Sequence, residues 1–187
     1  MSQVALPAFQ AVHHSPALNL NVGDTHQGGI VAYIFETSDA GYVAGEVHGL
    51  IAATSNQSTG IRWSNGSNIT TGATGTAIGT GLANTNAIIA SQGGTAGSYT
   101  YAAGICADYS VTEGGVTYDD WYLPSKDELN KLYLKRAEEG GFVSSDHWSS
   151  TEYNNDNAYS QDFGSGANLS EGGGKYKTDY VRPIRSF

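Results

Sequence analysis

Histidine and cysteine are the side chains of this sequence best suited to catalysis or metal binding. The five histidines are His13, His14, His26, His48 and His147. None of them forms an HExxH pair or has a cysteine partner at the spacing of a zinc site. Cys106 lies among small and apolar residues without an electropositive neighbour, which favours a small buried side chain over a reactive thiolate. We therefore predict no metal, no cofactor and no catalytic histidine or cysteine.

Paired carboxylates are the next candidates for chemistry, and they occur at Asp119-Asp120 and Glu138-Glu139. The sequence places neither pair for glycoside hydrolysis. A nucleophile elbow and a dinucleotide fingerprint are absent, and the glycine-rich stretch GATGTAIGTG lacks the Lys-Ser/Thr pair of a phosphate loop. The sequence therefore predicts a protein that is not an enzyme.

Loop oxygens could in principle bind calcium. The candidate ligands are Asn154, Asn155, Asp156, Asn157 and Asp162. They do not have EF-hand spacing, and clusters of Asn and Asp are more often turns. We favour the turn interpretation and assign no metal ligands.

Composition and charge exclude several classes of partner. The chain has 187 residues, which suits one domain with a short extension, and its charged fraction of 14% is low. The net charge is −9, and before Pro124 the sole basic residue is Arg62. An acidic chain without a basic stripe is a poor ligand for nucleic acid or for an anionic membrane surface. We therefore predict neither as a partner.

Targeting signals are also missing from the sequence. No apolar run approaches the roughly 18 residues of a membrane span, so membrane insertion is not predicted. The N-terminal stretch lacks the basic and apolar regions of a secretory signal. Low charge with abundant Gly, Asn, Ser, Thr and Tyr is nevertheless typical of extracellular, cell-surface or virion proteins, so export by another route or carriage on a particle is expected.

The elements that would position these residues begin after an extension, residues 1–23, and form one domain over 24–187. Strands are predicted at Gly28–Thr37 and His48–Thr54, because β-branched and aromatic residues are bounded by glycines. The Gly/Thr/Asn-rich stretch 64–81 is predicted to be a long ordered loop. Short strands with glycine turns are expected in DHWSSTEY, NAYSQDFGSG and DYVRPIRSF, with Pro183 on an edge or at a bulge.

Three helices are predicted. One covers LANTNAIIASQG, with Leu82, Ile88 and Ile89 on one side and Thr80 as a cap. A short one lies in TYAAGICADY, where Ala102, Ile105, Cys106 and Tyr109 share a face. The third begins at a capping box of Ser125 and Glu128, repeats Leu129, Leu132, Tyr133 and Ala137 at helical spacing, and ends at Gly140-Gly141. Its charged residues are interpreted as a solvated face.

The order of several motifs resembles the Lcl C-terminal-like domain family, named after the end domain of a bacterial collagen-like adhesin. The stretches that carry the resemblance are GDTHQGGIVAYIF, HGLIAAT, DWYLPSKDELNKLY, HWSSTEY and YVRPIRSF. Together they span residue 23 to the last residue. One departure is His147, where the family more often has an aromatic residue.

The resemblance implies an α+β, C-type-lectin-like fold close to the formylglycine-generating-enzyme type. Two main helices would flank a small twisted antiparallel sheet, with the N-terminal strand GGIVAYIF paired to the C-terminal strand YVRPIRSF. Formylglycine-generating chemistry needs reactive cysteines, which a lone Cys106 does not supply. The Glu-Pro-Asn and Trp-Asn-Asp signatures of calcium-dependent lectins are absent as well.

In this superfamily the ligand surface is formed by the segment between the last central strands, here Tyr153 to Lys177. Similar segments are rewritten in the variable proteins of diversity-generating retroelements. Tyrosine offers a large amphipathic contact area at low entropic cost, and Asn and Ser offer adaptable hydrogen bonds. Trp148 is assigned to the core. The predicted ligand-binding residues are Tyr153, Asn154, Asn155, Asp156, Asn157, Tyr159, Gln161, Asp162, Ser165, Asn168, Ser170, Glu171, Lys175 and Tyr176.

Three functions remain open on the sequence. The favoured one is a non-enzymatic receptor-binding or adhesin module, on a phage tail or a cell surface, for a cell-surface protein or glycan. The second is a carbohydrate- or peptidoglycan-active enzyme that uses Asp156, Asp162 and Glu171. The third is a structural cap that trimerises a fibre, in which residues 1–23 would drive assembly into a homotrimer.

Overall fold

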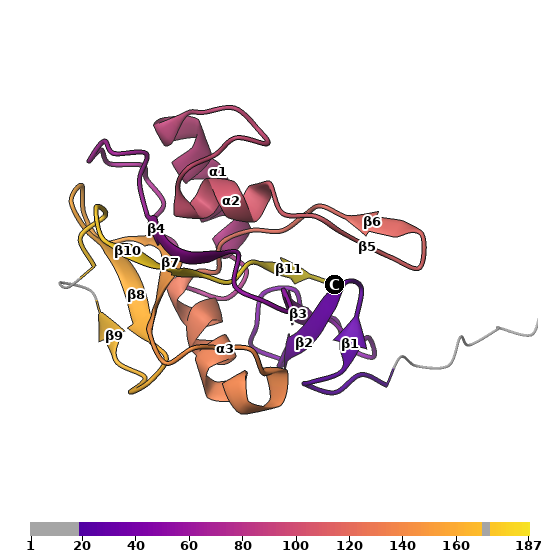
Figure 1. Cartoon of the computed structure of the whole chain (residues 1–187). Coiled ribbons are helices and arrows are strands. Elements are labelled where there is room, and N and C mark those ends of the chain that lie inside the picture. Colours follow the sequence, from indigo (N-terminus) through magenta and orange to yellow (C-terminus); the bar gives the residue numbers. More distant parts are fainter. Residues whose placement is uncertain (1–18, 170–172) are drawn as a thin grey trace, which may run out of the picture.

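The computed structural model describes residues 19–169 and 173–187, which form three helices and several small sheets (Figure 1). The predicted α+β class is confirmed. Residues 1–18 of the predicted extension lie outside the described residues. The elements in chain order are β1 (Thr25–His26), β2 (Gly29–Ile34), β3 (Gly49–Ala52), β4 (Ser58–Arg62), α1 (Gly81–Gln92), α2 (Ala102–Ala107), β5 (Val111–Glu113), β6 (Val116–Tyr118), α3 (Lys126–Glu139), β7 (Asp146–Glu152), β8 (Ala158–Asp162), β9 (Asn168–Leu169), β10 (Thr178–Val181) and β11 (Ile184–Ser186).

The first sheet is antiparallel and has the strand order β1-β2-β3-β11. Both strands predicted from GGIVAYIF and HGLIAAT are present. The predicted pairing of the N- and C-terminal strands is wrong, because β3 lies between them: Ile51 pairs with Val31 on one side and with Arg185 on the other. Consecutive strands usually pair. The hairpin of β2 and β3 therefore leaves the free edge of β3 for β11.

The second sheet has the order β4-β10-β7-β8-β9 and is not purely antiparallel. β10 and β7 run parallel, with Tyr180 beside His147, and the other pairs are antiparallel. The last predicted strand is split at Pro183, which lies between β10 in this sheet and β11 in the first. Because proline has no backbone N–H to donate, it suits the point where the chain leaves one sheet for the other rather than an edge strand or a bulge.

The helices lie on both sides of the sheets (Figure 1). α1 packs on β7 and α2 packs on α1, around a core that includes Trp63, Ile88, Cys106 and Trp148, so the core assignment of Trp148 is confirmed. α3 contacts β2, β7 and β8 around a second core that includes Leu132. This arrangement agrees with two main helices flanking sheet structure. The C-type-lectin-like assignment itself stays a prediction.

α1 occupies the predicted segment but buries a different face. Ile88 is fully buried, whereas Leu82 is 48% exposed. The polar residues Asn84 and Thr85 are buried instead, and Asn84 donates to the backbone oxygen of Gly75 at 2.6 Å. Thr80 does not cap the helix with its side chain, because its hydroxyl donates to the Ala77 oxygen at 2.7 Å. Polar contacts with the preceding loop therefore orient this helix more than apolar periodicity does.

α3 begins at the predicted capping box. The Ser125 hydroxyl accepts from the Glu128 N–H at 3.3 Å, and the Ser125 N–H donates to Glu128 Oε2 at 2.7 Å. The prediction that the charged residues of α3 form a solvated face is wrong for two of them, since Glu128 is fully buried and Glu139 is 9% exposed. Burial raises the pKa of Glu139 to about 8. Within the described ranges, no helix combines the length and the apolar character required to traverse a bilayer.

Candidate binding surface

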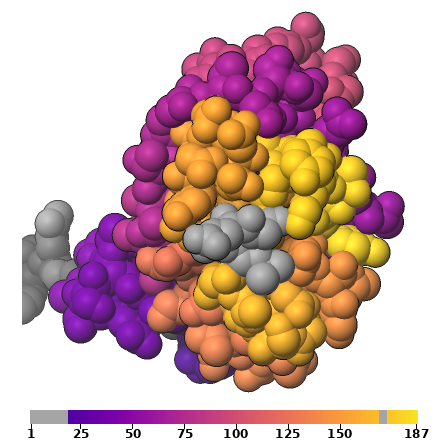
Figure 2. Space-filling view, turned by 90° about the vertical axis from the view of Figure 1, so that its left-hand side faces the viewer, coloured from indigo at the N-terminus to yellow at the C-terminus, as the bar shows by residue number. Residues whose placement is uncertain are grey.

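Two turns close in space form the centre of the predicted ligand surface. Residues 153–157 connect β7 to β8, and residues 173–177 precede β10. The Ala158 N–H donates to the Gly173 oxygen, and the Lys175 N–H donates to the Asp156 oxygen, each at 2.9 Å. Figure 2 shows the two turns, in orange and yellow, on one face of the molecule. Main-chain bonds therefore fix one turn against the other.

Large aromatic side chains project from these turns and from the adjoining start of β8. Tyr153 is 46% exposed and Tyr176 is 65% exposed, while Tyr159 is half-buried. The rings of Tyr153 and Tyr159 meet edge to face, with centroids 5.5 Å apart, and the Lys126 ammonium lies 5.3 Å from the Tyr159 centroid. Edge-to-face packing of this kind is favourable for aromatic pairs. We call the three tyrosines, together with residues 154–157, the tyrosine rim.

The amide side chains of the rim hold the turn. Asn154 Oδ1 accepts from the N–H groups of Asp156 (2.9 Å) and Asn157 (2.8 Å), and from the Asn157 side chain at 3.1 Å. Asp156 Oδ1 accepts from Asn68 Nδ2 at 3.0 Å, so the 64–80 loop braces the turn from outside. Asn155 is exposed. The turn interpretation is therefore correct for Asn154. The Tyr153 ring and the Asn155 amide face solvent.

Another group of predicted ligand-binding residues is separated from the rim. Asp162 ends β8, at the opposite end of that strand from the 153–157 turn, and accepts from the Gly164 N–H (2.7 Å) and the Ser165 hydroxyl (2.6 Å). These hydrogen bonds lower the pKa of Asp162. Ser165 and Asn168 are exposed beside it. Two further predicted residues, Ser170 and Glu171, lie outside the described residues.

Two predicted ligand-binding residues, Gln161 and Lys175, are fully buried. Gln161 Nε2 donates to Asn130 Oδ1 at 2.9 Å, which ties β8 to α3. Their placement on the ligand surface is therefore wrong. Lys175 directly precedes the exposed Tyr176 in a tight turn and is turned to the inside, and a buried amide or ammonium group then needs internal partners.

The partner of Lys175 is a carboxylate that the sequence did not identify. Lys175 Nζ lies 2.5 Å from Glu152 Oε1 and 2.8 Å from the backbone oxygen of Ile69, and both charged side chains are shielded from solvent. The Glu152 carboxylate also accepts from the N–H groups of Thr71 and Gly72. The strand β7, the 64–80 loop and the 173–177 turn thus meet at one buried ion pair beneath the rim. Glu152 directly follows WSST in the buried strand β7. This continuity was the feature of the sequence that could have indicated a buried carboxylate.

A metal site in a protein needs several His, Cys, Asp or Glu side chains close together. Across residues 19–169 and 173–187, no three His, Cys, Asp or Glu side chains are arranged to hold a metal. Cys106 is fully buried, and burial raises its pKa well above the usual value, so the interpretation as a small core side chain is confirmed.

Comparison with known families supports the resemblance found in the sequence. Residues 52–185 match the Lcl C-terminal domain. No curated protein matches the chain. The family match associates the chain with adhesin-like, cell-surface modules. Since it covers more than half of the sequence, the chain belongs to the Lcl C-terminal domain family.

Proposed function

We propose that this chain is a non-enzymatic adhesin module, outside the cell or on a virion, that holds a cell-surface protein or glycan at its tyrosine rim. The observation that carries the proposal is the exposure of Tyr153 and Tyr176 on adjacent turns whose backbones are bonded to each other. Tyrosine is enriched where one protein grips another, because its ring supplies area and its hydroxyl a hydrogen bond.

The support beneath the rim favours binding without large rearrangement. The buried Glu152–Lys175 ion pair and the bond between Asn68 and Asp156 fix the turns from two sides. A surface that is already ordered loses less conformational entropy when a partner binds. The rim is therefore suited to hold a partner even though only a few of its own side chains make the contact.

The spacing of the carboxylates argues against glycoside hydrolysis. Asp156 precedes the five-residue strand β8 and Asp162 ends it. At about 3.3 Å per residue, a strand of this length separates its ends by about 13 Å. The two carboxyl groups of glycosidases lie roughly 5–9.5 Å apart. Binding without turnover is therefore the better reading of these two residues.

The test is an array of cell-surface glycans and proteins probed with the full chain. We expect the double variant Tyr153→Ala/Tyr176→Ala to lose affinity by about tenfold or more for any partner found, as buried aromatic anchors do. Tyr42→Ala is the matched control, since Tyr42 is 37% exposed on the 36–48 loop and is not part of the rim. Equal binding by the double variant and the control would contradict the proposal.

Turnover is measured on the same partners. A bound glycan incubated with the chain is analysed for released products. Product release that depends on Asp156 or Asp162 would replace the binding proposal with the enzymatic one.

We further propose that the rim is a diversified segment. The backbone bonds of the two turns do not depend on the side chains of Tyr153, Asn155 or Tyr176, so these positions can change without loss of the frame. A nearby genomic repeat of codons 153–177 that differs at adenines would support diversification, and a genomic neighbourhood without such a repeat would contradict it.

A further inference from the structure

Two cavities flank the 36–48 loop on a part of the surface that shares no residue with the tyrosine rim. The first has a volume of about 370 Å³ and is lined by Phe35, Gly41, His48, Ser186 and Phe187 among others; we call it the aromatic cavity. The second has about 520 Å³ and includes Asp39, Asp127, Asn130 and Lys131; we call it the acidic cavity. Both volumes fall within the range of small-ligand sites.

The walls of both cavities are fixed by hydrogen bonds. Tyr33 donates its hydroxyl to Asp39 Oδ2 at 2.6 Å, which ties the 36–48 loop to β2. On the facing wall, the Gly79 N–H donates to the buried Glu128 Oε1 at 2.7 Å, and the Ser125 hydroxyl donates to the Ala77 oxygen at 2.9 Å. The cavities are therefore preformed rather than dependent on an ordering step.

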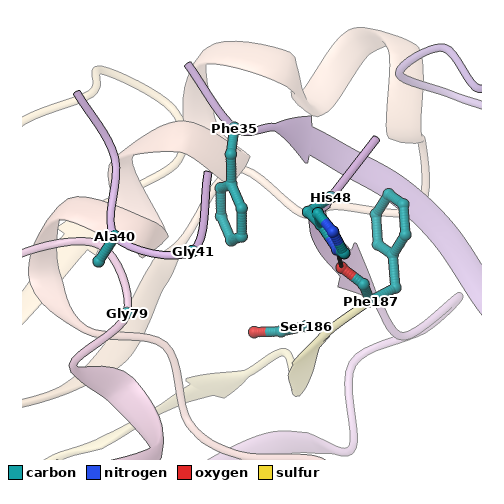
Figure 3. A pocket seen from close by; sticks show the side chains of 7 residues that line it. All are labelled: Phe35, Ala40, Gly41, His48, Gly79, Ser186 and Phe187. Carbon is teal, nitrogen blue, oxygen red and sulfur yellow. Dashed lines mark hydrogen bonds between the residues drawn. The ribbon is translucent and has the colours of Figure 1, made fainter. Parts of the chain in front are cut away.

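The aromatic cavity offers ring faces and almost no free hydrogen-bonding groups. Figure 3 shows Phe35 and His48 on two sides of the space, with the Ser186 hydroxyl between them. Both nitrogens of His48 are occupied, one by the Phe187 oxygen at 3.0 Å and the other by Glu46 at 2.8 Å. The Ser186 hydroxyl is paired with Tyr122 at 3.0 Å. A sugar needs several polar partners, so this cavity suits a flat apolar group better.

The acidic cavity suits a cation. Its carboxylates are those of Asp39 and Asp127, and Glu36 lies next to the first, since the Glu36 N–H donates to Asp39 Oδ2 at 2.8 Å. The opposing charges are Lys131, whose ammonium lies 4.2 Å from the centroid of the Tyr33 ring, and Lys126, whose ammonium lies 3.9 Å from Asp127 Oδ1. Carboxylates thus outnumber ammonium groups around this cavity, and a guanidinium can pair with them in a fixed geometry.

The distance between the cavities sets the spacing of a ligand that fills both. They share Ala40, and their facing walls come from consecutive residues: Ala77 and Ile78 for the acidic cavity, and Gly79 for the aromatic one. Consecutive Cα atoms lie about 3.8 Å apart. From this placement we infer that the groove binds a short peptide segment in which an aromatic side chain enters the aromatic cavity and a neighbouring arginine enters the acidic cavity. This second site does not rest on the function proposed for the tyrosine rim.

The test measures binding of three capped dipeptides to the full chain by NMR titration. Acetyl-Phe-Arg-amide is expected to shift the signals of Ala40 and Gly79. Acetyl-Phe-Glu-amide and acetyl-Ala-Arg-amide should each bind about tenfold more weakly or worse, because one loses the charge complementarity and the other the ring. Equal binding of all three dipeptides would overturn the inference, and so would a neutral trisaccharide, maltotriose, that shifts these signals in their place.

Two variants locate the binding. Ala40→Trp places a bulky side chain at the exposed residue that both cavities share, and Asp127→Lys reverses one charge of the acidic cavity. Each should weaken acetyl-Phe-Arg-amide by about tenfold. Asp119→Lys, a charge reversal at an exposed residue outside both cavities, and Tyr153→Ala in the rim should leave it unchanged. Unchanged binding in both cavity variants would place the peptide elsewhere and reject the site.

Discussion

Lys175 brings its ammonium group to a position without solvent contact, where Glu152 and the Ile69 oxygen replace the water it has lost. The ammonium also lies 4.7 Å from the centroid of the Trp63 ring. Removing a charge from water is costly, and a buried pair compensates for this cost only while both partners are present. The role of Lys175 is therefore structural, although its neighbour Tyr176 is the most exposed tyrosine of the rim.

Lys175→Met should destabilise the fold by about 3–5 kcal/mol, because it leaves the Glu152 carboxylate buried without its cation. The measurement is the free energy of unfolding in urea. Lys135→Met is the control, since Lys135 faces Glu138 at 4.0 Å in an exposed pair, where a loss of about 1 kcal/mol or less is expected. Similar losses in the two variants would show that the buried pair does not fix the frame.

His147 occupies a core position as an uncharged ring. Its ring centroid lies 4.2 Å from that of Phe163 and 5.5 Å from that of Tyr180, and it is fully buried. Nδ1 lies 2.9 Å from the Ser145 oxygen, while Nε2 has no hydrogen-bond partner in the described part of the chain. Burial lowers the pKa of His147 to about 4. The imidazole thus takes the place of an aromatic core side chain.

The lowered pKa of His147 predicts acid sensitivity. The unfolded chain takes up this proton below about pH 6.5 and the folded chain only near pH 4, so stability is present above pH 6.5 and is lost as the pH falls toward 4. A shift of this size corresponds to about 3 kcal/mol. His147→Phe removes the titration, so its stability relative to the natural chain should rise by about that amount between pH 7 and pH 4. A pH-independent difference, measured by urea unfolding at both pH values, would contradict this origin.

At the scale of the element, local signals predicted more than long-range ones. The capping box of α3 was visible because Ser125 and Glu128 are three residues apart. The second role of Glu128, as acceptor for the Gly79 N–H, joins residues 49 positions apart and leaves no local pattern. For the same reason the sequence indicated exposed tyrosines but not the ion pair beneath them, and it named the terminal strands without finding β3 between them. Contacts between residues close in the chain can be predicted from their spacing. Contacts between distant residues depend on how the elements pack, which spacing does not show.

Glu128→Ala should lower the free energy of unfolding by more than the loss of an ordinary capping residue does. Loss of a capping interaction costs about 0.5–2 kcal/mol, and stranding the N–H groups of Ser125 and Gly79 adds about 1–3 kcal/mol for each that stays buried. We expect a total of about 3 kcal/mol, together with faster hydrogen exchange at Gly79. Asp127→Ala, in the same helical turn but half-exposed, is the control and should cost less than about 1 kcal/mol. Unchanged exchange at Gly79 would mean that Glu128 serves the helix alone.

At the scale of the whole molecule, the question is how two separate sheets unfold as one body. The chain passes from the second sheet to the first at Arg182 and Pro183. Arg182 is 2% exposed, and its guanidinium donates to Asn56 Oδ1 (2.8 Å), the Ala53 oxygen (2.7 Å) and the Gly141 oxygen (2.5 Å). One side chain therefore links the end of β3, the following turn and the end of α3. A planar fork with several donors is suited to three acceptors in different directions.

Arg182→Lys tests this link, because the compact ammonium group of lysine cannot donate to three separated acceptors at once. With the buried Ala53 oxygen and the part-buried Gly141 oxygen left unpaired, at about 1–3 kcal/mol for a buried group and less for a part-buried one, we expect a loss of about 3 kcal/mol in the free energy of unfolding. Arg62→Lys, on the exposed edge strand β4, is the control and should change stability by less than about 0.5 kcal/mol. If Arg182 couples the sheets, the variant should also show fluorescence and circular-dichroism transitions that no longer coincide, as expected when cooperativity is lost. Coincident transitions with unchanged stability would show that packing alone, rather than this guanidinium, joins the two sheets.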